Sequence, residues 1–415
     1  MTPVSPVLRR YGLVLISGAG LAALCVGLAP ATYYDLVEWP LSDLGRRLFA
    51  PGVTPATLIS GLLMPFFLLL IGKELWESLR LDRGLAARGR LPGPLLVALG
   101  GMAGGALVWT LASALLQTAE EAAGTPGWVF PLAGDTILAF LFGCMILGRG
   151  HPALQILLFV TIFADVTALV MAGLFAPALQ GLEVSRFLWL ILPLAAACLA
   201  HVLLTRPAQR PDASEVTRQR AQHLWLWALP GIVSWFGVAM AGFPPALGLL
   251  PLLPAMPHSD RSFGLFAEAE GFLTDPLNRL SHLLMTPLLL VLALFAFTHG
   301  AILPGLLSEP TTAITLLAFW IGKPAGVMAA ILLCRGLGLR LDLAPGWREP
   351  ALIAGLAGIG FTVPLLMLHG SLPGGMMQEA ARLGLALSVL AGPVLWVAAR
   401  RSGIRPVRTG SAIRR

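Results

Sequence analysis

Charged residues are scarce in this chain. Only 12% of its 415 residues are charged and 57% are hydrophobic, whereas about 25% of the residues of a soluble domain are charged. A soluble chain of this length needs charged surface around several separate cores, so the composition excludes most soluble proteins. Apolar runs of about 20 residues, the length at which a helix spans a bilayer, recur along the sequence. The sequence therefore predicts an all-α polytopic membrane protein.

Lysine is almost absent. Of the 28 basic residues only Lys73 and Lys323 are lysines, and the others are arginines. The net charge of +7 would suit a nucleic-acid binder, but such proteins gather basic residues on a solvated domain, and the sequence contains none. We therefore expect no nucleic-acid partner. The four cysteines lie in apolar runs without a CxxC pattern, and we interpret them as small buried hydrophobic residues.

Motifs of membrane-bound enzymes are also missing. No HxxxxD, HExxH or GxSxG pattern lies on a connection between apolar runs, so we do not expect an enzyme. The sequence has no region that would fold as a soluble nucleotide-binding domain, and we therefore expect no cofactor.

The apolar runs predict twelve membrane spans, which give a single transmembrane domain over residues 1–400 and a basic tail over 401–415. The predicted spans cover residues 12–29, 54–72, 92–117, 128–148, 153–175, 187–205, 223–241, 243–256, 283–303, 311–334, 350–369 and 381–399.

The arginines report the orientation of these spans. If the N-terminus is cytoplasmic, 23 basic residues lie on the cytoplasmic side and 4 on the outer side, and the remaining one, Lys323, lies inside a span. Because cytoplasmic connections carry an excess of Lys and Arg, we predict that both termini are cytoplasmic. The basicity of the chain then reflects its topology.

Apart from Arg382 at the outer end of the last span, three charged residues lie inside the predicted spans. They are Asp135, Asp165 and Lys323, and charges in a span are costly and mark function by default. Asp135 lies within a stretch that contains helix-breaking proline and glycine, residues 131–136, and a similar stretch occurs at 355–364. Interrupted spans at matching positions in two halves are typical of transporters built from inverted repeats. Spans 3–5 and 10–12 form the predicted pair, with the two interrupted helices crossing near the midplane.

The half-helix ends at such breaks carry partial charges that buried side chains can offset. Asp135 has the correct sign for the N-terminal ends and Lys323 for the C-terminal ends. Asp165 is left without an obvious partner, and since burial disfavours its charged form, it could exchange a proton for a cation. Two alternatives stay open: a lone aspartate can simply hydrogen-bond across helices, and a glycine-rich span can be a close-packing face.

The sequence resembles the NhaA-type bacterial sodium/proton antiporter family over about residues 10–400. The matching stretches are IGKPAG at 321–326, GIGFT at 358–362, GWVFP at 127–131 followed by Asp135, FFLL at 66–69 followed by Gly72 and Glu74, RLSH at 279–282 and LFAF at 294–297. The first two are specific to the family when they occur together.

The resemblance implies a secondary transporter of the bacterial inner membrane that exchanges sodium or lithium for protons in pH homeostasis, with a homodimer as the expected assembly. The resemblance and the residues above assign ion and proton binding to Asp165, Asp135 and Lys323, with Asp165 binding sodium transiently. Support of the interrupted helices is assigned to Gly134, Thr136, Gly358, Gly360 and Thr362. A pH response is assigned to His282 and Glu74.

One departure from the family concerns the ion site itself. The family has adjacent acidic residues, DD or ND, and here the pair is Ala164-Asp165. A shift of one residue would instead leave Val166 at the essential second position, but we prefer the first register because the match continues to Leu174-Phe175. The expected acidic partner of Lys323 is then missing, so we expect exchange closer to electroneutral than in the DD branch.

This missing acid also leaves two other functions open. A divergent relative could transport another ion or an organic anion, since half-helix N-termini suit anions. A sensor that does not transport is the second alternative.

Overall fold

The computed structural model describes residues 4–41, 52–80, 89–116, 127–175, 184–210, 212–257, 276–344, 346–404 and 406. The regular elements formed by these residues are helices. The N-terminal elements are α1 (Pro6–Leu28), α2 (Pro30–Val37), α3 (Pro55–Leu58), η2 (Ile59–Leu63), α4 (Met64–Arg80), α5 (Pro92–Leu116), η3 (Gly127–Leu132), α7 (Thr136–Leu147) and α8 (Ala153–Phe175). The segments that follow α2 and precede α3 make one isolated backbone contact, in which the Leu41 N–H donates to the Val53 carbonyl at 2.8 Å.

The remaining elements follow in chain order. They are η5 (Val184–Leu190), α9 (Ile191–Ala200), η6 (His201–Thr205), α10 (Arg206–Ala208), α11 (Glu215–Gln222), α12 (Trp225–Met240), η7 (Pro245–Ala255), α13 (Pro276–Met285), α14 (Pro287–His299), η9 (Pro304–Leu306), α15 (Pro310–Leu317), η10 (Ala318–Gly322), α16 (Lys323–Gly336), α17 (Arg348–Ala357), α18 (Thr362–Ser371), α19 (Met376–Ser388) and α20 (Ala391–Arg401).

The predicted fold class is confirmed. Across the described ranges, eight helices are long and apolar enough to span a membrane, three more spans arise if each bent helix pair is one span, and η7 is a shorter apolar helix. That set agrees with about twelve spans. The eighth is the least regular because Pro251 and Pro254 lie inside it and proline cannot donate a backbone hydrogen bond, so it winds as a short 3₁₀ helix.

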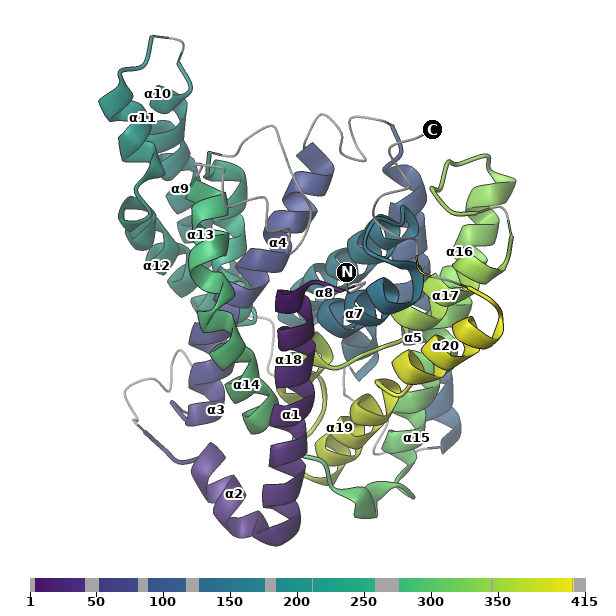
Figure 1. Cartoon of the computed structure of the whole chain (residues 1–415). Coiled ribbons are helices and arrows are strands. Elements are labelled where there is room, and N and C mark those ends of the chain that lie inside the picture. The colour runs from purple at the N-terminus through teal and green to yellow at the C-terminus, as the bar shows by residue number, and fades with distance from the viewer. Residues whose placement is uncertain are drawn as a thin grey trace.

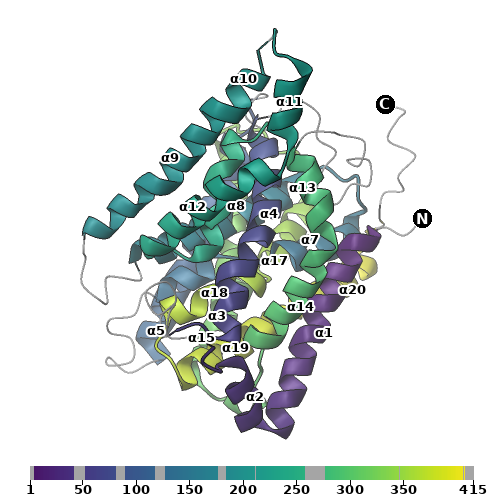
Figure 2. The same cartoon turned by 90° about the vertical axis from the view of Figure 1, so that its left-hand side faces the viewer.

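The helices form one elongated bundle (Figures 1 and 2). In both views α2 lies at one end of the molecule and α10 and α11 lie at the other. Helix α1 packs along α14, and α9 packs along α12. Many leucines on α1, α5 and α9 are exposed, as expected for surfaces that face lipid.

Helix α5 packs directly against η10 and α16, which joins the two predicted repeats. Glycines line this contact on both sides. A Cβ atom on Gly104 would lie 2.2 Å from the Gly322 carbonyl oxygen, and one on Gly326 would lie 2.1 Å from the Gly100 carbonyl oxygen. No larger residue fits such a distance, which is the close backbone approach that small residues permit between membrane helices.

Both predicted interruptions are present. The first separates η3, which ends at Leu132, from α7, and the second separates α17, which ends at Ala357, from α18, with a bend of 45° between the two helices. A Cβ atom on Gly360 would lie 2.0 Å from the ring of Phe319. The glycines of the second break therefore have both of the roles considered from the sequence. The span is unwound at these glycines, and they also allow close packing against Phe319.

Candidate ion-binding site

Asp135 joins the two interrupted helices. Its side chain is fully buried and caps α7, because one carboxylate oxygen accepts from the Leu138 N–H at 2.6 Å. The other oxygen accepts from the N–H of Thr362 at 2.8 Å and from its hydroxyl at 2.5 Å. Thr362 is the first residue of α18, so a single carboxylate binds the positive N-terminal ends of both half-helices.

Asp165 comes from the middle of α8 and touches the first break. It is also fully buried. One oxygen accepts from the Gly134 N–H at 2.7 Å and the other accepts from the Thr136 hydroxyl at 2.8 Å. An ionised carboxylate has about four acceptor positions, so this group keeps capacity for a proton or a cation after both hydrogen bonds are made.

Lys323 approaches the same break from the opposite repeat. It is the first residue of α16, it is 3% exposed, and its ammonium donates to the carbonyls of Leu132, at 3.3 Å, and of Ala133. The ammonium also lies 5.1 Å from the centre of the Phe319 ring, a cation–π distance. The lysine therefore binds the negative C-terminal end of η3, as the charge argument predicts.

The acidic partner that the family pattern would give Lys323 is absent. Ala164 is 4% exposed and belongs to the apolar core. The ion pairs found among the described residues lie elsewhere and do not include Lys323. The structure places Asp165 against Gly134 and Thr136, and the register of the acidic pair stays a prediction.

The structure brings most of the predicted site residues together at the crossing of the two breaks. A Cβ atom on Gly134 would lie 3.4 Å from the Lys323 ammonium and 3.5 Å from the Ile359 carbonyl oxygen, and one on Gly358 would lie 2.4 Å from the Phe319 carbonyl oxygen. Glu74 and His282 belong to two other helices, α4 and α13, which contact each other. The roles assigned to all these residues stay predictions.

Two residues at the crossing did not emerge from the sequence. Phe319 stands four positions before Lys323, a spacing that places two side chains on the same side of a helix, and this signal could have found it. Ser388 is fully buried in α19, and its hydroxyl hydrogen-bonds to both the N–H and the carbonyl oxygen of Gly360. A single serine in an apolar span carries no sequence signal for such a role.

Two interrupted helices that cross, with buried charges at their half-helix ends, define a class of polytopic membrane transporter. The sequence matches the family described as Na+/H+ antiporter 1 over residues 8–399. The chain therefore belongs to this family, and the resemblance found in its motifs is confirmed.

Individual relatives agree with this assignment. The chain is 32% identical over 394 residues to the Na(+)/H(+) antiporter NhaA of Jannaschia sp., with 91% of this chain and 93% of the relative covered. It is 29% identical over 403 residues to the antiporter of the same name from Geobacter metallireducens, with 97% and 98% covered. The structure of the sodium proton antiporter MjNhaP1 from Methanocaldococcus jannaschii is 14% identical in sequence, with a TM-score of 0.53 and 94% and 96% coverage, which shows a shared fold.

Proposed function

We propose that this protein exchanges sodium or lithium for protons across the bacterial inner membrane, with Asp165 as the carboxylate that binds each of them in turn. The observation that carries this proposal is the environment of Asp165. The side chain is fully buried, its two oxygens are fixed by the Gly134 N–H and the Thr136 hydroxyl, and none of the salt bridges within the described ranges includes it.

The chemistry of exchange follows from this arrangement. A carboxylate held at a break of two helices can bind one hard cation or one proton, but the two compete for the same oxygens. The Thr136 hydroxyl and the backbone carbonyls of the breaks supply further oxygen atoms nearby. Access to Asp165 from alternate sides of the membrane then couples the movement of the cation to that of the proton.

The same geometry argues against an anion as cargo. The N-terminal ends of α7 and α18 would suit an anion, but Asp135 already occupies both of them. The non-transporting alternative is tested by the transport assay itself.

The topology predicted from the arginines completes the proposal, with both termini in the cytoplasm. Three contacts support it. Arg90 pairs with Asp342 at 2.9 Å and His151 with Glu349 at 3.3 Å, and each pair joins two connections that are predicted to be cytoplasmic. At the opposite end, the Tyr33 hydroxyl donates to the Phe297 carbonyl at 2.6 Å, which joins a connection predicted to be outside to the second half of the predicted span 283–303. The homodimer, the single domain over 1–400 and the tail over 401–415 remain part of this proposal.

The function is tested by measuring exchange in everted membrane vesicles. Addition of sodium or lithium should dissipate an imposed pH gradient, and potassium should not. Expression should also allow a sodium-sensitive, antiporter-deficient strain to grow on high sodium. A protein that is folded in the membrane and inactive in both assays would exclude the proposal.

Exchange should be electroneutral. Asp165 carries one proton or one monovalent cation. The Lys323 ammonium is held by backbone carbonyls, and the acid that would alter the charge of Lys323 during transport is replaced by Ala164. Moving one net charge across a potential of about 100 mV changes the free energy by about 2.3 kcal/mol. The rate of electrogenic exchange would therefore depend strongly on the potential. In proteoliposomes with a potassium diffusion potential, we expect the initial rate to be the same with and without the potential. Rates that rise sharply with the potential would contradict one-for-one exchange.

Lys323→Arg should retain exchange. If Lys323 acts as a fixed cation at the C-terminal end of η3, a guanidinium can replace its hydrogen bonds to Leu132 and Ala133; if Lys323 releases a proton during transport, arginine cannot, because it stays protonated. Lys323→Met serves as the comparison, since it leaves both carbonyls without a donor and should lower the melting temperature. A stable but inactive Lys323→Arg protein would indicate that the lysine proton is used.

A further inference from the structure

The two interrupted helices are built on one plan. The residues before α7 are Gly134, Asp135 and then Thr136 as the first helical residue, and those before α18 are Gly360, Phe361 and then Thr362. In each break the glycine N–H donates to a side chain in the last span of its own repeat. Gly134 donates to Asp165 of α8 at 2.7 Å, and Gly360 donates to Ser388 of α19 at 3.0 Å. Ser388 therefore occupies in the second repeat the place that Asp165 occupies in the first.

Ser388 holds the unwound segment through several contacts. Its side chain is fully buried, and besides accepting from the Gly360 N–H its hydroxyl can donate to the Gly360 carbonyl at 2.9 Å or to the Leu385 carbonyl at 2.7 Å. Its own carbonyl accepts from the indole N–H of Trp320 at 3.1 Å. On the other side of Gly360 lies the ring of Phe319, so the segment is fixed between α19 and η10.

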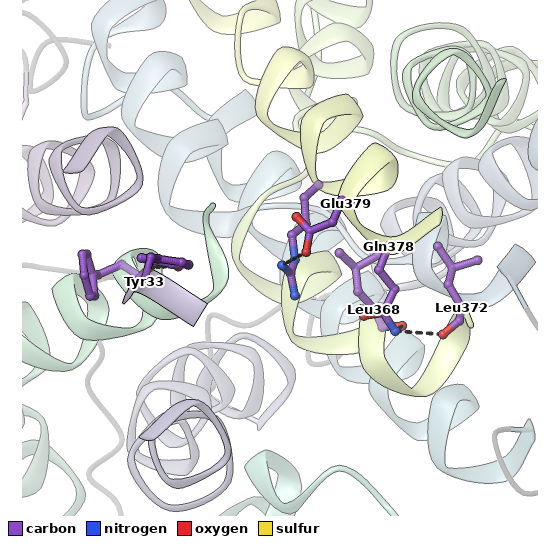
Figure 3. Close-up of polar contacts among 7 residues, drawn as sticks. Tyr33, Leu368, Leu372, Gln378 and Glu379 are labelled. Carbon is purple, nitrogen blue, oxygen red and sulfur yellow. Dashed lines mark hydrogen bonds and ion pairs between the residues drawn. The ribbon is translucent and has the colours of Figure 1, made fainter. Parts of the chain in front are cut away.

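Helix α19 also holds the far end of α18. In Figure 3 the Gln378 side chain reaches from the first turn of α19 to the carbonyls of Leu368 and Leu372, at 3.3 and 2.9 Å. These carbonyls belong to the C-terminal end of α18, where backbone acceptors lack partners within the helix. Helix α19 thus braces α18 at both ends, through Gln378 at one and Ser388 at the other.

A short series of contacts connects Ser388 to the ion site. Gly360 stands two residues before Thr362, whose N–H and hydroxyl bind Asp135. Asp135 caps α7, and the first residue of α7, Thr136, donates to Asp165. A change in the backbone at Gly360 is therefore transmitted to an oxygen atom beside the carboxylate that binds the cation.

We propose that Ser388 is a positioning residue for cation binding, the neutral counterpart in the second repeat of Asp165 in the first. It fixes the second break so that Thr362 keeps both of its hydrogen bonds to Asp135, and it does so without adding a third carboxylate to Asp135 and Asp165 at the crossing. This inference rests on the proposed role of Asp165.

The test compares three variants in proteoliposomes, with apparent KM for sodium, maximal rate and melting temperature measured for each. Ser388→Ala leaves the buried Gly360 N–H without an acceptor, and we expect its apparent KM to rise about tenfold, the size of effect that follows from one unsatisfied buried group. Ser388→Thr restores the hydroxyl and should restore the KM. The matched control is Ser371→Ala in α18, because Ser371 is also buried but its hydroxyl has no partner among the described residues, and its KM should equal that of the unchanged protein.

The proposal is overturned if Ser388→Ala has the KM of the Ser371→Ala control, or if it lowers only the melting temperature. If Ser388→Ala does not fold, Ser388→Cys keeps the volume with weaker hydrogen bonding and should show an intermediate KM; an unchanged KM for that variant would also overturn the proposal. Asp165→Asn is assayed alongside. An active Asp165→Asn protein would refute the proposed function itself, whereas an inactive one with a normal Ser388→Ala protein would refute only the role of Ser388.

Discussion

Replacing Asp165 with asparagine should reduce sodium/proton exchange to the level of empty liposomes. The asparagine side chain has the same shape, its oxygen can accept from the Gly134 N–H, and its amide can donate to the Thr136 hydroxyl in place of the present contact. The break is therefore kept, while the group can neither bind a proton near neutral pH nor carry a negative charge toward a cation. The initial rates with sodium, lithium and potassium measure the effect.

Two comparisons separate this loss from a loss of folding. The melting temperature of Asp165→Asn should be close to that of the unchanged protein, since the side chain keeps its shape and one hydrogen bond to each of its two partners, with the Thr136 hydroxyl accepting in place of donating. Asp342→Asn removes a carboxylate that is 40% exposed and paired with Arg90, and it should exchange normally because exposed ion pairs contribute little. Sodium-dependent exchange by Asp165→Asn would remove this residue from the site.

Local features of the sequence predicted the fold and the positions of the breaks. Pro131 and Gly134 in one span and Gly358 and Gly360 in another mark places where a helix unwinds, and charge is so rare in the spans that Asp135, Asp165 and Lys323 stand out. The signs of the charges then gave which end of a half-helix each residue binds. These features can be identified from the sequence because a charge or an unpaired backbone group inside a bilayer is costly and must be satisfied within the protein.

The partners across the crossing could not be predicted in this way. Asp135 and Thr362 are 227 positions apart, and Lys323 and Ala133 are 190 apart. Which carbonyl or amide a buried charge meets depends on how the repeats pack, and that is fixed by glycines such as Gly104 and Gly326 at the contact of α5 with α16. Ser388 shows the same limit, because serine is common in spans and only the contact with Gly360 gives it a role.

The contacts of Asp135 give the second large prediction, which concerns stability. Asp135→Ala leaves three buried donors without an acceptor, the N–H groups of Leu138 and Thr362 and the Thr362 hydroxyl. Each unsatisfied donor costs about 1–3 kcal/mol, and the like-charged N-terminal ends of α7 and α18 would then face each other without a counter-charge. Since the whole folding free energy of a protein is about 5–15 kcal/mol, we expect a large drop in melting temperature and little protein in the membrane.

Asp135→Asn and Thr362→Ala divide this effect into its parts. Asparagine has one acceptor oxygen in place of two, so it can serve α7 or α18 but not both, and its melting temperature should lie between those of Asp135→Ala and the unchanged protein. Thr362→Ala removes only the hydroxyl and keeps the N–H contact, so it should be the mildest of the three. If Asp135→Ala melts at the temperature of the unchanged protein, this carboxylate does not hold the two half-helices together, and the crossing must be stabilised by Lys323 and the glycine contacts alone.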